Sequence, residues 1–281
     1  LGANATLAVS LANSKSAALS KKKPIYKNLG NSFSLPNPLM NIINGGAHAD
    51  NDLKIQEFMI RPDSAKNFLD AIEKCYVVIQ NLKKILKSKK MLTNVGDEGG
   101  FAPNINTSSE VIETILKAIN DAGFKPGEDI YLSLDVASTE FYKNNNYDLS
   151  GENLSLNSDQ MIEYLEKLVN SYPIYSIEDG MSEDDWEGWT NLTQLLGNKI
   201  QLVGDDLFVT NKNRLQRGIN ERAGNSILVK VNQIGTLNET LESIKLAKEN
   251  NFTTIISHRS GETEDTTIAD LSVGVSAGQI K

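Results

Sequence analysis

The sequence predicts an α/β protein built as a closed (β/α)₈ barrel, and three observations support this fold class. Short apolar runs end on charged side chains at Asp135, Glu178, Asp205 and Lys230, and a fifth run ends just before His258. These positions follow one another at spacings of 43, 27, 25 and 28 residues, and each of the last three spacings fits one strand, one crossover helix and two loops. The length of 281 residues accommodates one barrel of about 250 residues and little more. Catalytic groups of such barrels lie at the carboxyl ends of the strands, where this pattern puts its charges.

The amino-terminal part of the barrel departs from the repeating βα pattern. Apolar segments at 39–43 and 55–60 lie too close together for a crossover helix, so they predict a hairpin at the start of the barrel, followed by βα units. Alternation in the second segment puts Gln56 on the face opposite to Glu57.

Apolar residues at helical spacing, together with capping residues, predict the helices. The expected helices cover residues 5–20, 63–90, 107–122, 160–169, 182–196, 213–220, 236–248 and 268–276. Capping-box patterns open two of them, at Thr107 with Glu110 and at Thr236 with Glu239. Met91 and Leu92 indicate a short strand, and a last strand is expected to begin near Gly278.

Composition restricts the classes of function. A net charge of −8 and a pI near 5.0 argue against a nucleic-acid partner. No apolar run approaches the roughly 18 residues of a membrane span, and the first residues lack the basic head of a secretion signal, so a cytoplasmic protein is expected. Cys75 is the only cysteine and lies in a helical pattern, which predicts a buried structural thiol.

The charged strand ends indicate metal chemistry. Asp135, Glu178 and Asp205 would repel one another at a common mouth unless a cation held them together. A ligand set of carboxylate oxygens favours a hard divalent ion such as Mg²⁺. A cation near Lys230 would also favour its neutral amine, the form that acts as a base. The alternative interpretation is that each acid caps a neighbouring helix.

Five further positions are candidates with structural alternatives. Glu98 lies in a glycine-rich segment and can be a simple turn residue, and His48 can serve only to hydrogen-bond its own loop. The His258-Arg259-Ser260 cluster suits a phosphate or a carboxylate, although a structural ion pair would also explain it.

Taken together, eight segments resemble the enolase family in a form typical of bacteria, and the resemblance covers the whole chain. These segments are LGANA at 1–5, NGGAHA at 44–49, IQEFM at 55–59, VGDEGG at 95–100, SIEDG at 176–180, GDDL at 204–207, LVKVNQIG at 228–235 and SHRSGE at 257–262. The resemblance implies a barrel of the enolase type, with a ββαα(βα)₆-like start. It also implies a glycolytic lyase that interconverts 2-phospho-D-glycerate and phosphoenolpyruvate plus water with Mg²⁺.

The resemblance further implies residue roles. Lys230 is expected to be the base, Glu98 the acid, and Asp135, Glu178 and Asp205 the Mg²⁺ ligands. A lysine or histidine base with one or two Mg²⁺ ions is a general property of this superfamily. The implied substrate contacts are His48, Gln56, Glu57, His258, Arg259, Ser260 and Lys281.

The ends of the chain differ from the family pattern. We expect residues 1–33 to be a helical remnant of an amino-terminal domain with its linker, and residues 34–281 to be the barrel domain, truncated at both ends. We expect a small-molecule substrate and no nucleic-acid or membrane partner. The full-length form is expected to be a homo-oligomer, which the resemblance implies is a dimer. The alternative function is a catalytically inactive barrel that serves as a binding or structural core.

Overall fold

The computed structural model describes residues 2–281. The chain divides into two compact units. Unit 1 consists of Leu1–Asn37 and Val203–Lys281, and unit 2 consists of Pro38–Leu202. Two strands, β1 (Asn37–Pro38) and β9 (Gln201–Gly204), contain the points where the chain passes between the units.

Unit 2 opens with the predicted hairpin. Strand β2 (Met40–Asn44) pairs antiparallel with β3 (Glu57–Arg61), and β3 pairs antiparallel with β4 (Tyr131–Asp135). Strand β4 then pairs parallel with β8 (Ile174–Glu178). The hairpin and the change to parallel pairing confirm the expected start of the barrel.

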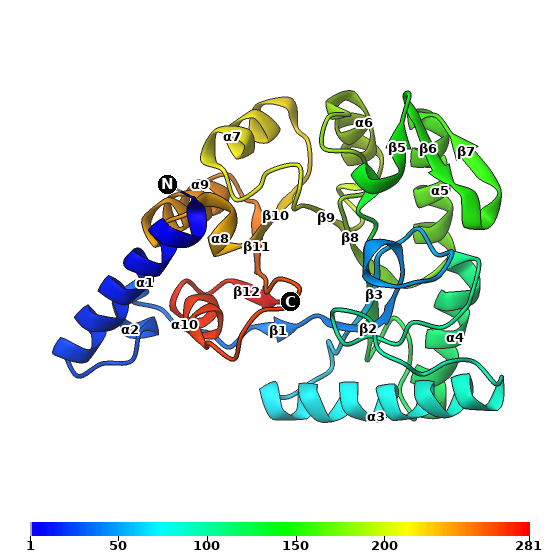
Figure 1. Cartoon of the computed structure of the whole chain (residues 1–281), viewed down its shortest axis with the longest axis horizontal. Helices are drawn as coiled ribbons and strands as arrows, with labels where there is room; N and C mark the ends of the chain where they lie inside the picture. Colours follow the sequence, from blue (N-terminus) through cyan, green and yellow to red (C-terminus); the bar gives the residue numbers. More distant parts are fainter. Residues whose placement is uncertain (1) are drawn as a thin grey trace. The chain divides into compact units, whose positions relative to one another are not determined.

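Two consecutive helices, α3 (Phe68–Ser88) and α4 (Ser108–Asp121), connect β3 to β4 and lie against each other in unit 2 (Figure 1). The Thr107 hydroxyl caps α4 by accepting the backbone N–H of Glu110, as predicted. The predicted strand at Met91 and Leu92 is wrong. The Met91 N–H instead donates to the Leu86 carbonyl (2.9 Å), and this hydrogen bond belongs to the C-terminal cap of α3.

Other elements of unit 2 also differ from expectation. Helix α3 begins at Phe68, five residues after the predicted start at 63, because the Asn67 side chain caps it by accepting the N–H of Asp70 (3.0 Å). Helix α6 (Trp186–Leu196) begins four residues later than predicted, because the Asp185 carboxylate caps it through the N–H of Gly188 (2.9 Å). A three-stranded antiparallel sheet was not predicted. Its strands are β5 (Tyr142–Lys143), β6 (Asn146–Leu149) and β7 (Leu154–Leu156), and short 3₁₀ turns flank them at η2 (Ser138–Phe141) and η3 (Ser150–Glu152).

The small sheet is attached through a buried tyrosine. The Tyr147 hydroxyl donates to the Asp185 carboxylate (2.8 Å) and accepts the N–H of Ser182 (3.1 Å). Burial, chiefly, raises the pKa of Tyr147, so the hydroxyl keeps its proton and its donor role at ordinary pH. Helix α5 (Ser158–Ser171) follows β7 and opens with a complete capping box at Asn157 and Gln160.

Unit 1 contains parallel strands and their helices. Strand β10 (Ser226–Val229) pairs parallel with β11 (Thr253–Ile256) and with the Val203–Gly204 end of β9, and β11 pairs parallel with β12 (Gly278–Ile280). The helices are α1 (Ala3–Ser20), α2 (Tyr26–Leu29), α7 (Lys212–Glu221), α8 (Val231–Ile234), α9 (Leu237–Glu249) and α10 (Thr267–Gly274). The parallel ladder confirms the βα repeat that the spacings of the charged strand ends predicted. Among the described residues, no helix combines the length and the apolar content that a membrane crossing requires.

The environment of Cys75 leads to a first prediction. Its side chain is fully buried on α3, and burial raises the pKa of the thiol to about 12. The thiolate is the reactive form, so we expect the native protein to react with iodoacetamide roughly a thousandfold more slowly than an exposed cysteine. Mass spectrometry after timed labelling measures this rate. Rapid labelling of the folded chain would contradict the burial, whereas labelling in denaturant is expected to be complete.

Candidate active site

Three buried carboxylates of unit 2 form a row across adjacent strands. Glu57 on β3 is paired with Asp135 on β4, and Asp135 is paired with Glu178 on β8, so their side chains project from the same face of the sheet. They are 1%, 4% and 2% exposed. Neighbouring carboxylates at such low exposure repel one another, and a cation offsets both the repulsion and the cost of burial. Gln56 adds a long contact from its side-chain amide to Asp135 Oδ2 (3.4 Å).

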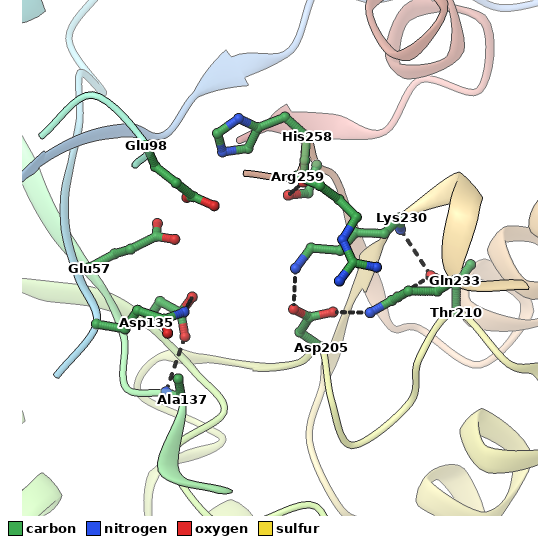
Figure 2. Close-up of polar contacts among 12 residues, drawn as sticks. Glu57, Glu98, Asp135, Ala137, Asp205, Thr210, Lys230, Gln233, His258 and Arg259 are labelled. Carbon is green, nitrogen blue, oxygen red and sulfur yellow. Dashed lines mark hydrogen bonds and ion pairs between the residues drawn. The ribbon is translucent and has the colours of Figure 1, made fainter. Parts of the chain in front are cut away.

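A tight glycine loop positions Glu98. The Gly96 N–H bonds to the Gly100 carbonyl (2.8 Å), and Gly99 has φ +85°, a left-handed conformation that favours glycine. A Cβ at Gly96 would lie 2.5 Å from the His48 carbonyl oxygen, so only glycine allows the two loops to approach this closely. The Glu98 side chain is 7% exposed, and its carboxylate points toward the side of the site where Glu57 lies (Figure 2). Glu98 is therefore more than a surface turn residue.

His48 lies between two of these acids. It ends the 3₁₀ turn η1 (Gly46–His48), and its ring nitrogens face different carboxylates. The distance from Nδ1 to Glu57 Oε1 is 3.6 Å, and the distance from Nε2 to Glu98 Oε1 is 3.8 Å. Both distances are too long for hydrogen bonds, so the imidazole is placed near the acids without being bonded to these oxygens. The interpretation that His48 only bonds its own loop does not account for this position.

In unit 1, Lys230 directly follows β10, and its amine is 2.5 Å from Asp205 Oδ2 (Figure 2). The other oxygen of Asp205 accepts the side-chain amide of Gln233 (2.8 Å). Both charged side chains are largely buried, at 16% and 8% exposure. The backbone N–H of Lys230 donates to the Thr210 hydroxyl (2.9 Å), which itself donates to Gln233 Oε1 (3.0 Å). The amine is thus held at the strand end by a network of hydrogen bonds on both sides of Asp205.

The segment after β11 carries the predicted anion-binding cluster. The His258 N–H donates to the Lys281 carbonyl (3.1 Å), which ties the start of this loop to the end of β12. Arg259 and Ser260 are exposed, and the Arg259 backbone N–H donates to the Glu262 carboxylate (2.7 Å). The guanidinium and the hydroxyl therefore lie at the surface of a loop whose backbone is anchored.

Comparison with known protein families decides the identity of the fold. The family model described as the enolase C-terminal TIM barrel domain matches residues 32–281. The chain belongs to the enolase family. The match establishes the predicted barrel class and an enzyme-type domain, and in this superfamily a divalent metal normally takes part in lyase-type chemistry.

The candidate residues of this enolase domain are divided between its two units. Unit 2 carries His48, Gln56, Glu57, Glu98, Asp135 and Glu178, and unit 1 carries Asp205, Lys230, His258, Arg259, Ser260 and Lys281. Within unit 2, the buried and register-paired Asp135 and Glu178 fit a divalent ion, because they present hard oxygen donors side by side.

Some residues of the candidate site were not predicted. Thr210 and Gln233 hold the Lys230 and Asp205 pair, and neither lies at a strand end. The signal for Gln233 is its position three residues after Lys230, since the single turn of α8 brings such positions onto one side. Thr210 has no comparable signal, because its place depends on a left-handed backbone (φ +54°) in the loop before α7.

The loop that carries Arg259 gives a prediction about pH. Hydrogen bonds from Lys15, and then from the hydroxyl and backbone N–H of Thr267, lower the pKa of Asp265 to about 2. A depressed carboxyl pKa contributes stability above the unfolded value near 4, and this contribution is lost as the pH falls from about 4 to about 2. The side chains of Lys15 and Asp265 are 39% and 42% exposed, so solvent limits the contribution to about 1 kcal/mol or less.

Asp265→Asn is therefore expected to be less stable than the parent near neutral pH and equally stable at about pH 2. Urea unfolding of both proteins at several pH values measures the difference. A stability gap that is the same at neutral and at acidic pH would show that the Asp265 charge is not its source.

Proposed function

We propose that the chain interconverts 2-phospho-D-glycerate and phosphoenolpyruvate plus water, with Mg²⁺ as its cofactor. The observation that carries this proposal is the amine of Lys230, held after the end of β10 by Asp205, whose other oxygen accepts the Gln233 side-chain amide. Proton transfer from carbon requires a base held within hydrogen-bond reach of its target, and Asp205 positions the amine in this way. The amine acts as a base in its neutral form, which a divalent cation held by Asp205 would favour. Family membership and the buried acids of unit 2 add support.

In this proposal Lys230 takes the C2 proton of 2-phosphoglycerate, and the released electron pair forms the C2–C3 double bond. Glu98 gives a proton to the C3 hydroxyl as the C3–O bond breaks, so water leaves and phosphoenolpyruvate remains. Asp135, Glu178 and Asp205 would hold Mg²⁺, which when bound supplies positive charge to the substrate carboxylate. The reverse reaction uses the same two residues with their roles exchanged.

The remaining residues are proposed to bind the substrate. His48, Gln56 and Glu57 would line the side of the site near Glu98, while His258, Arg259, Ser260 and Lys281 would bind the phosphate and carboxylate groups. The exposed Arg259 guanidinium suits a phosphate, because its fork of donors can bind two oxygens at once. We further infer that the protein is a cytoplasmic enzyme of glycolysis and that it forms homo-oligomers. Residues 34–281 are proposed to make up the barrel domain.

Glu98→Gln tests the division of labour between acid and base. The variant keeps Lys230, so we expect it to exchange the C2 hydrogen of 2-phosphoglycerate with D₂O while forming phosphoenolpyruvate about 10²-fold to 10⁴-fold more slowly. Proton NMR follows the exchange and phosphorus NMR follows the product. Glu128→Gln, at an exposed glutamate, is the matched control and is expected to behave as the parent. Equal loss of exchange and product in Glu98→Gln would remove Glu98 from the role of acid.

A further inference from the structure

A group of three side chains that could bind a metal ion lies in unit 2, apart from the proposed Mg²⁺ ligands. One ligand atom each from His48, Glu57 and Glu98 lies within 4.8 Å of the other two. We propose that these three residues form a site for a d-block dication such as Zn²⁺.

The donor set determines the class of ion. One imidazole nitrogen with two carboxylate oxygens is a ligand set typical of zinc, whereas Mg²⁺ selects oxygen alone. Zinc binds such donors at about 2.0–2.1 Å, which puts neighbouring ligand atoms of a tetrahedron about 3.3 Å apart. One ligand atom from each residue lies within 4.8 Å of the other two, while the distances of 3.6 Å to Glu57 and 3.8 Å to Glu98 start from different ring nitrogens, Nδ1 and Nε2. The ion binds one ring nitrogen, so the carboxylate beside the other nitrogen has to move toward it, and water can occupy the fourth position.

His48 provides an independent indication of a ligand. Its Nδ1 atom is shielded from solvent and has no hydrogen-bond partner among the described residues. Buried polar atoms are rarely left in this state, because each unmade bond costs free energy. The nearest carboxylate oxygen of Glu57 is too distant for a hydrogen bond to Nδ1, and a bound ion would draw the two groups together.

Backbone hydrogen bonds hold the three ligands in place before any ion binds. The Asp97 N–H donates to the His48 carbonyl (3.3 Å), which joins the Glu98 loop to the His48 loop. The Gly45 N–H donates to the Gln56 carbonyl (2.8 Å), which joins the His48 loop to the strand that carries Glu57. Ligands on directly bonded segments lose little conformational freedom on binding, so this arrangement favours affinity.

The site shares its residues with the proposed hydratase activity, but its binding of Zn²⁺ is measured without substrate. Where Glu98 is also the acid, Zn²⁺ at this site would hold its carboxylate and compete with proton transfer. A chain that binds Zn²⁺ here without forming phosphoenolpyruvate would refute the proposed activity alone, and an active chain without this site would refute the present proposal alone.

The chain has two histidines, and this makes the test direct. Nitrogen-15 NMR of the imidazoles, in protein already saturated with Mg²⁺, would be followed as ZnCl₂ is added, with His48 assigned by its absence in His48→Gln. We expect the His48 nitrogens to shift until about one equivalent of Zn²⁺ has bound and the His258 nitrogens to stay unchanged. Mg²⁺ alone should leave the His48 nitrogens in place.

Variants at the carboxylates test the remaining ligands on the same resonance. Glu57→Gln and Glu98→Gln should each weaken Zn²⁺ binding at His48 by at least about tenfold, a loss typical even of residues one shell away from a metal. Glu128→Gln is the matched control and should bind as the parent does. The proposal is overturned if Zn²⁺ leaves His48 unshifted, shifts both histidines alike, or binds equally well to both carboxylate variants.

Discussion

Replacing Lys230 with alanine is expected to lower kcat for phosphoenolpyruvate formation by about 10²-fold to 10⁴-fold, the usual contribution of a positioned general base. The variant should also lose the exchange of the C2 hydrogen with solvent, because no other residue of the proposal removes that proton. This paired loss separates Lys230→Ala from Glu98→Gln, in which exchange should survive. Steady-state kinetics and proton NMR in D₂O measure the two quantities.

The control for this variant is Lys212→Ala. Lys212 forms an ion pair with Glu242 (3.4 Å) in which both side chains are about half exposed, so its removal should change kcat little. In Lys230→Ala the Asp205 carboxylate keeps its bond from Gln233, and circular dichroism is expected to show a folded chain. A folded Lys230→Ala protein with the parent's kcat would remove Lys230 from the role of base.

Replacing Asp135 with asparagine is expected to have an effect of comparable size, through loss of Mg²⁺. Asparagine keeps the shape of the side chain and an oxygen that can accept the Ala137 N–H, which Asp135 Oδ1 accepts at 3.1 Å, but it lacks the charge that a hard cation requires. We expect activity to fall at least about 100-fold, and the Mg²⁺ concentration for half-maximal activity to rise.

Thermal unfolding separates this metal effect from simple destabilisation. Mg²⁺ binds the folded state, so it should raise the Tm of the parent protein and not that of Asp135→Asn. In EDTA the variant should be at least as stable as the parent, because Asp135 and Glu178 are paired across two strands and repel each other when both are charged. Asp148→Asn, an exposed position on β6, serves as the control and should keep the Mg²⁺ response. An undiminished rise of Tm with Mg²⁺ in Asp135→Asn would exclude Asp135 as a ligand.

Much of the fold could be predicted because burial imposes a pattern on the sequence. The buried parallel strands β8 and β10 are short apolar runs, and the first charge after each run marks its end, which identified Glu178 and Lys230. Met91 and Leu92 show the limit of the same reasoning. Two apolar residues beside a loop resemble a strand in sequence, but the Met91 N–H is hydrogen-bonded to Leu86 in the C-terminal cap of α3.

The candidate site was less predictable, since its contacts depend on loops that meet only in the folded chain. Nothing in the local sequence indicates that His48 lies beside Glu98, which is 50 residues away, because their approach depends on the absence of a side chain at Gly96. Thr210 likewise reaches Lys230 from a different βα unit. Strand ends therefore predict which residues are present at a site, while the hydrogen bonds that orient them require the structure.

The most direct test of the proposed function is phosphorus NMR of 2-phosphoglycerate incubated with the purified chain and Mg²⁺. The proposal predicts that the phosphoenolpyruvate signal appears at a rate proportional to protein concentration, stops when EDTA is added, and resumes with excess Mg²⁺. A folded chain that binds Mg²⁺ but forms no phosphoenolpyruvate would contradict it and would favour a barrel that serves as a binding or structural core.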